Sequence, residues 1–163
     1  MLAKAKVNIT NLRNFSRGLE SSPIMKEAIA KWGKQYNRFM VARFKKFSRG
    51  GGNWQKLKSS TIAKKSANKN RILIEIGDLL SQLQSTLSLE PRVRSLRVTA
   101  GVSDEIFHSR SNMSLAELVN LHQSGAGNLP VRQIVVAPPA RVINAMRNVG
   151  NRALAKLADK TRG

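Results

Sequence analysis

The feature that most constrains this chain is a series of large apolar residues that recurs every three or four positions between Pro23 and Phe47. This spacing places the series on one face of an α-helix. Ser22 at the N-cap position and Pro23 in the first turn predict where the helix begins, and three glycines at 50–52 predict where it ends. The apolar face contains Met25, Ile29, Trp32, Tyr36, Phe39, Met40, Phe44 and Phe47.

Three further helices are predicted along the chain. A short one falls within residues 72–83, where leucines at helical spacing follow Gly77. A second begins at Ser114, which forms a Ser-x-x-Glu capping box with Glu117, and continues to about His122. A final helix follows Pro138 and Pro139.

Alternating apolar and polar residues predict strands in the second half of the chain. The pattern occurs on both sides of Pro91 within residues 87–102, which predicts a β-hairpin, and residues 131–136 are a further candidate strand. We therefore expect an α+β fold. In this fold a long N-terminal amphipathic helix and shorter helices pack on a small antiparallel sheet, with a helix at the C-terminal end.

The length of 163 residues suits one domain of ordinary size. We expect residues 1–21 to form an N-terminal arm and residues 22–163 to form a single α+β domain. Within that domain, residues 50–71 combine lysines and arginines with serines, threonines and asparagines, which predicts a basic loop containing one helical turn.

Charge points to an anionic partner, because 29 Lys and Arg against 9 Asp and Glu give a net charge of +20. Most of this excess precedes Ile72. The basic residues at the end of the long helix and in the following loop are therefore the best candidates for a basic surface that faces DNA or an acidic protein. They are Arg43, Lys45, Lys46, Arg49, Lys56, Lys58, Lys64 and Lys65.

The residues that enzymes need are scarce. The chain has no cysteine, which excludes disulfides, thiolate zinc sites and a cysteine nucleophile. Its two histidines, His108 and His122, form no metal-binding motif, and Asp104 and Glu105 fall in a loop-like stretch. The glycines at 50–52 lack the Gly-Lys-Ser or Gly-Lys-Thr of a phosphate-binding loop. We expect no enzymatic activity, no cofactor and no metal.

A membrane role is also disfavoured. No run of about 18 apolar residues is present, and charges interrupt the stretch where a signal peptide would be apolar. The long basic helix is amphipathic, which also suits a membrane surface. However, only 5% of the residues are aromatic, and the helix holds several of them, so we expect its apolar face to lie in the core.

Several short motifs follow one another in order. They are a Trp-x-x-Leu-x-x-x-Thr stretch from Trp54, a Leu-x-x-x-Gly-x-Leu stretch from Leu73, an alternating hairpin, a His-Gln-x-Gly helix end at His122 and a Pro-x-Arg strand start at Pro130. In order and spacing they resemble the phage virion-morphogenesis family of tail-completion proteins, also called tail terminators or neck proteins. The resemblance covers roughly residues 24–136. The motif residues are Trp54, Leu57, Thr61, Gly77, Leu79, His122, Gly125, Pro130 and Arg132.

This resemblance implies a structural role in the virion. The expected protein is a non-enzymatic component of a phage head–tail junction, made in the host cytoplasm, that forms a homo-oligomeric ring, most often of six copies. Its partners would be further copies of itself, the connector and the tail-tube proteins, with non-specific contact to genomic DNA. The charge leaves open an alternative, a monomeric basic nucleic-acid-binding protein without sequence preference.

The motif residues also have physical roles that do not depend on the family. Trp54 can fold back over the long helix, Gly77 permits a tight turn, and Gly125 can cap the helix that ends near His122. We expect His122 to hydrogen-bond a backbone group and Arg132 to pair with an acid on a neighbouring subunit.

Overall fold

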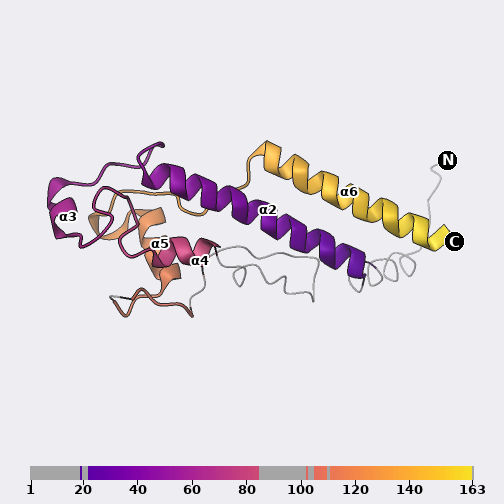
Figure 1. The fold of residues 1–163 in the computed structure, drawn as a ribbon, viewed down its shortest axis with the longest axis horizontal. Helices are drawn as coiled ribbons and strands as arrows, with labels where there is room; N and C mark the ends of the chain where they lie inside the picture. Colours follow the sequence, from indigo (N-terminus) through magenta and orange to yellow (C-terminus); the bar gives the residue numbers. More distant parts are fainter. Residues whose placement is uncertain (1–18, 20–21, 85–101, 103–104, 110, 163) are drawn as a thin grey trace, which may run out of the picture.

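The computed structural model describes residues 19, 22–84, 102, 105–109 and 111–162. Two long helices lie side by side and run in opposite directions, and short helices and loops gather at one end of this pair (Figure 1). The long helices are α2 (Pro23–Ser48) and α6 (Ala140–Arg162). The short elements are α3 (Ser59–Lys64), α4 (Asp78–Gln84), α5 (Leu115–Ser124) and the 3₁₀ turn η2 (Ala126–Asn128).

Helix α2 has the bounds that the sequence predicts. Ser22 occupies its N-cap position, although the serine side chain makes no capping hydrogen bond, and Pro23 lies in the first turn. Its last turn carries Lys45 and Lys46, where the helix dipole favours positive charge. The chain leaves the helix through Gly50, whose φ of +83° is the left-handed conformation that glycine adopts most easily.

The larger of two hydrophobic cores lies where the C-terminal half of α2 meets the loops. Its buried residues come from α2, from the segment after the glycines, from α4 and α5, and from the chain beyond η2. Trp54 packs edge-on against Phe44 and Phe47, with ring centroids 5.6 and 5.4 Å apart. The buried members are Phe44, Trp54, Ile72, Ile74, Leu79, Leu83, Val119 and Ile134.

The second core joins α2 to α6 and is built from smaller residues. Met25, Ala28 and Ala153 are its buried members. Gly150 of α6 lies so close to Trp32 of α2 that a Cβ atom there would be 2.9 Å from the indole ring. Glycine at this position therefore allows the two helices to approach closely.

The predicted α+β class is wrong, because the structure is mostly helical and its described residues form no sheet. The described part of the chain contains one isolated antiparallel bridge, between Phe107 and Ser114. Apart from Val102, the predicted hairpin at 87–102 lies outside the described residues.

The candidate strand at 131–136 runs along α2 without pairing to another strand. Side chains satisfy its backbone instead: the hydroxyl of Tyr36 donates to the carbonyl of Val136 at 2.7 Å, and Arg43 donates to the carbonyls of Gln133 and Ile134. A buried backbone needs hydrogen-bond partners but not a neighbouring strand, so an apolar segment that looked like a strand could be accommodated by helix side chains.

The two central short helices differ in how well the sequence predicts them. Helix α5 starts with the expected capping box, in which the Ser114 hydroxyl accepts from the backbone N–H of Glu117 at 3.1 Å. It ends at Gly125, which is left-handed with φ of +72°. Helix α4 begins at Asp78, directly after Gly77, whose positive φ makes the predicted turn, and Leu73 also has a positive φ, so the helix covers only the C-terminal part of the predicted range 72–83.

We predict that Trp54→Ala lowers the free energy of unfolding by ~3–5 kcal/mol, the range for losing a large core aromatic. The indole is buried and touches two rings of α2, so its loss leaves a cavity in the larger core. Urea denaturation followed by circular dichroism measures this change, with Lys58→Ala at an exposed position as the control. An unchanged midpoint together with weaker nucleic-acid binding would contradict the structural role of Trp54.

Candidate functional site

A cavity of about 400 Å³ brings together most of the motif residues. It lies among the loops beside α3, α4, α5 and the segment after η2. Trp54 packs in the core and Gly125 caps α5, so these two have purely structural positions. The motif residues that line the cavity are Leu57, Thr61, Gly77, Leu79, His122, Pro130 and Arg132.

Arg132 and His122 form a buried pair in the wall of this cavity. Arg132 is only 4% exposed, and its backbone N–H donates to the carbonyl of His122 at 2.7 Å. Its guanidinium Nη1 lies 3.3 Å from Nδ1 of His122, and Nη2 donates to the carbonyl of Gln55 at 3.4 Å. Because a guanidinium only donates, Nδ1 of His122 accepts, and the imidazole proton is on Nε2.

This environment keeps His122 neutral. Burial and the adjacent Arg132 charge lower the pKa of His122 to about 4. We expected the His122 side chain to bond a backbone group, but its Nδ1 faces the Arg132 guanidinium, and the backbone carbonyl of His122 accepts from the Arg132 N–H. Arg132 lies inside the chain rather than on an exposed surface, so the expected pairing with a neighbouring subunit can occur only within the cavity.

Two carboxylates also line the cavity, and hydroxyl and backbone donors hold both. Glu75 Oε1 accepts from the N–H and hydroxyl of Ser66, at 3.0 and 3.1 Å. Asp78 Oδ2 accepts from the N–H and hydroxyl of Ser109, at 2.9 and 2.7 Å. Within the described residues, no group of three or more His, Asp and Glu is placed to hold a metal ion.

Two of the eight predicted surface cations are structural. Arg43 lies over the Phe47 ring, 4.3 Å from its centroid, while it donates to the carbonyls of the 133–134 segment. Lys65 donates from Nζ to three backbone carbonyls and so fixes the loop between α3 and α4. Lys45 is half-buried. The exposed members are Lys46, Arg49, Lys56, Lys58 and Lys64.

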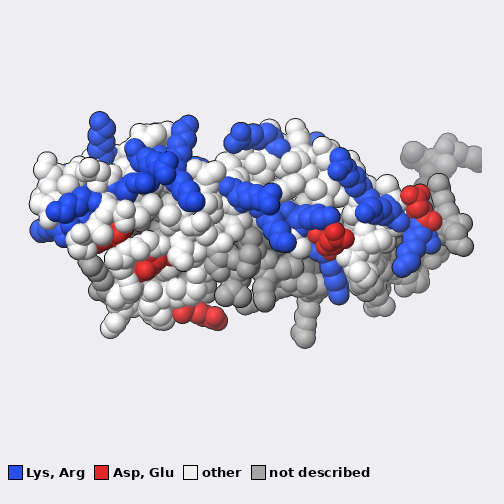
Figure 2. Space-filling view, in the orientation of Figure 1, with Lys and Arg blue, Asp and Glu red and all other residues white. Residues whose placement is uncertain are grey.

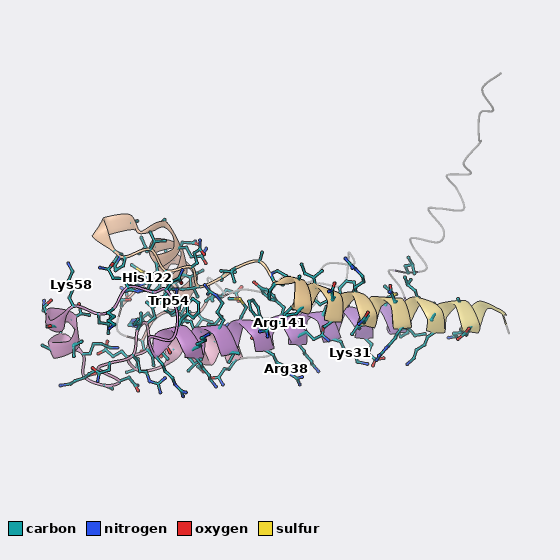
Figure 3. All side chains as sticks on the ribbon, turned by 90° about the horizontal axis from the view of Figure 1, so that it is seen from above. Lys31, Arg38, Trp54, Lys58, His122 and Arg141 are labelled. Atoms are coloured by element: carbon teal, nitrogen blue, oxygen red, sulfur yellow. The ribbon has the colours of Figure 1, made fainter. Side chains whose placement is uncertain are left out.

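Within the described residues, most of the exposed Lys and Arg side chains lie on the two long helices, whereas the sequence predicts a basic surface at the end of α2 and in the following loop. Figure 2 shows Lys and Arg gathered along α2 and α6 on the viewed face, and Figure 3 places Lys31 and Arg38 on α2 and Arg141 at the start of α6. We call this set the basic arm. Its exposed members are Lys26, Lys31, Lys34, Arg38, Arg141, Arg147, Arg152, Lys156 and Lys160.

The contribution of α6 was missed because the second half of the chain has little net charge. Residues 72–163 carry 11 basic and 7 acidic side chains, so the net charge of that half hides the cations of α6. Between Arg141 and Arg162 the chain has six basic residues against one acidic residue, and this local excess was the signal that could have revealed them.

Comparison with known proteins gives no match: no family model, no curated protein and no solved structure matches the chain. Among the described residues, no helix is both long enough and apolar enough to cross a membrane. The described residues form a mostly helical protein with a cavity at its loop-rich end and a strongly basic arm.

We predict that stability depends on pH through His122. The unfolded chain takes up a proton near the ordinary histidine pKa of 6.5, whereas the folded chain does so only near 4. The stabilising effect of the neutral buried ring is therefore complete above pH 6.5 and is lost as the pH falls toward 4. The free energy of unfolding should fall by about 2 kcal/mol between pH 7 and pH 5 from this group.

Chemical denaturation of the wild type and of His122→Gln at both pH values measures this effect. The variant should lose that part of the pH dependence. His108→Gln, which replaces the other histidine, serves as the matched control and should retain it. Equal pH dependence in the wild type and in His122→Gln would contradict the buried neutral imidazole.

Proposed function

We propose that this chain is a structural, non-enzymatic component of a phage head–tail junction that assembles into a homo-oligomeric ring. The observation that carries the proposal is the convergence of the motif residues. Segments as far apart in sequence as Leu57 and Arg132 meet around one cavity, and Trp54 supports them from the core. Such convergence is what a shared structural motif requires, and it supports the resemblance to tail-completion proteins.

Exposed apolar side chains provide surfaces for ring formation. Phe107 is 58% exposed and Val131 is 59% exposed, both on the loop-rich end of the molecule. Ile143 and Leu154 are exposed on α6, away from that end. A ring requires head-to-tail contacts in which one surface binds a different surface of the next copy. Two separate apolar regions on one chain meet that requirement.

The basic arm would then face an anionic neighbour. In a head–tail junction, both genomic DNA in the lumen and acidic surfaces of adjoining rings fit this role. The contacts that the structure shows for the arm are few: Lys31 pairs with Glu27 at 2.6 Å, and both side chains remain more than half exposed. Exposed ion pairs of this kind contribute little to stability, so most of the charge is available to a partner.

We predict that mass photometry of the purified chain detects a multiple of the 18.0 kDa protomer, with six copies expected from the resemblance. Phe107→Asp and Val131→Asp should reduce the mass toward one protomer while circular dichroism remains unchanged. Ser111→Asp, a charge added at another exposed loop position, is the control. A wild-type monomer at every concentration would contradict self-assembly.

The basic arm also favours a second candidate function, non-specific binding of nucleic acid by a monomer. Exposed cations on two adjacent helices provide an extended positive surface. Within the described residues, the two helices of the arm form none of the known DNA-reading motifs, in which a helix or a strand enters a DNA groove and its side chains contact the base edges. Binding would therefore be through phosphates and would be insensitive to sequence.

We predict that short DNA duplexes of unrelated sequence bind with similar affinity, and that affinity falls with salt by a log–log slope of ~0.9 per phosphate contacted. Fluorescence anisotropy at several salt concentrations measures the slope. If the arm contacts DNA, the triple change of Lys34, Arg38 and Arg147 to Gln should lower the slope of the salt dependence. The same change at Lys56, Lys58 and Lys64, which the sequence predicts for the basic surface, is the comparison and should lower the slope less than the change in the arm. Absence of DNA binding at low salt would contradict this second function and would favour an acidic protein as the partner of the basic arm.

A further inference from the structure

We propose that the cavity beside Arg132 is a binding site for a carboxylate carried on a small apolar group. This inference concerns the ligand of the cavity and holds whether or not the chain forms a ring. Figure 3 shows His122 and Trp54 together in the loop-rich end of the molecule, well separated from the labelled cations of the basic arm. The site is therefore distinct from the surface proposed to meet DNA or an acidic neighbour.

The first reason is the unsatisfied charge of Arg132. This side chain is 4% exposed, and a buried charge is destabilising unless a counter-charge and hydrogen bonds compensate for it. Its side-chain partners among the described residues are neutral, namely the ring of His122 at 3.3 Å and the carbonyl of Gln55 at a long 3.4 Å. The Nε atom is buried and has no hydrogen-bond partner among the described residues.

The second reason is the geometry of the free edge of Arg132. In a guanidinium, Nε and Nη2 donate from the same edge, which is the edge that a carboxylate binds through two parallel hydrogen bonds. Here one of these donors is unpaired and the other has only the long bond to Gln55. Gln55 and Arg132 both line the cavity, whereas the Nε atom itself is buried, so a carboxylate would reach this edge by replacing the Gln55 carbonyl.

The third reason is the composition of the walls. Lys56 and Lys58 also line the cavity and are exposed, so they can attract an anion to it. Glu75 and Asp78 are held by Ser66 and Ser109. The volume of about 400 Å³ lies within the range of small-ligand sites. The apolar lining residues are Leu57, Leu73, Ile76, Leu79, Leu118, Leu129 and Pro130.

A carboxylate with an apolar body could come from a small free acid or from an Asp or Glu side chain of a protein segment. Both would place two oxygens against Arg132 and an aliphatic portion against the leucines. Ile76 and Leu129 are exposed as well as lining the cavity, so apolar contacts continue to its rim. Such a rim favours an acidic side chain flanked by apolar residues of the same segment.

The test uses the two histidines of the chain as reporters, because labelling only Cε1 of histidine with ¹³C gives one ring signal per histidine, two in all, even in a large assembly. Sodium butyrate is titrated at constant ionic strength, and butyramide serves as its uncharged counterpart. We expect the His122 signal to shift and saturate with butyrate and to remain unchanged with butyramide. Equal responses to both compounds, or a butyrate response that does not saturate, would overturn the proposal.

Variants then locate the site. Arg132→Gln should weaken butyrate binding at least tenfold, while Arg49→Gln, an exposed cation outside the cavity lining, should leave it unchanged. Retained affinity in Arg132→Gln would overturn the proposal. Should Arg132→Gln fail to fold, the contrast between butyrate and butyramide on the wild type decides alone. Mass photometry of the same samples keeps this result separate from ring formation.

A final comparison identifies the source of the carboxylate. The peptide acetyl-Leu-Glu-Leu-amide is titrated beside butyrate, with the Gln-containing peptide as its control. Tighter binding of the Glu peptide than of butyrate assigns the site to an acidic protein segment. Tighter binding of butyrate assigns it to a small free acid. Binding of the Gln peptide as tight as that of the Glu peptide would contradict a carboxylate site.

Discussion

The edge-on packing of Trp54 against Phe44 and Phe47 connects the loop-rich end of the molecule to α2. The glycine turn after α2 brings Trp54 back onto the helix, and the chain between Trp54 and α4 then covers the same core. The other end of α2 packs against α6 through the second core and through the close approach of Trp32 to Gly150. One helix thus supports two separate cores, and the cavity can exist because its walls are anchored to a rigid element.

Local signals in the sequence predicted the helices well, because periodicity and caps act over a few residues. The start of α2 at Pro23, the capping box at Ser114 and the left-handed cap at Gly125 are all confirmed. Burial of Trp54 is confirmed as well. Each of these features depends on neighbours in sequence or on the need to cover one apolar face, so no knowledge of distant contacts was necessary.

Features that depend on distant contacts were predicted poorly. The alternation at 131–136 indicated a strand, but Tyr36 and Arg43, about 90 to 100 residues earlier, satisfy that backbone. The sequence predicts Arg43 and Lys65 as surface cations, and only the fold shows that both donate to backbone carbonyls. For the candidate site, the sequence supplied the motif residues but not their convergence on one cavity, because that convergence is a property of the tertiary structure.

The pairing of α2 with α6 has an electrostatic consequence. Packed helices have axes about 8–10 Å apart, which is close to the Debye length of about 10 Å at 0.1 M ionic strength. The exposed cations of the two helices therefore repel one another across the contact in dilute buffer, and the second core has to overcome this repulsion. Screening by added salt relieves it. Salt thus strengthens the association of the two helices while it weakens their attraction for a polyanion, and a bound polyanion would itself act as the counter-charge that holds the pair together.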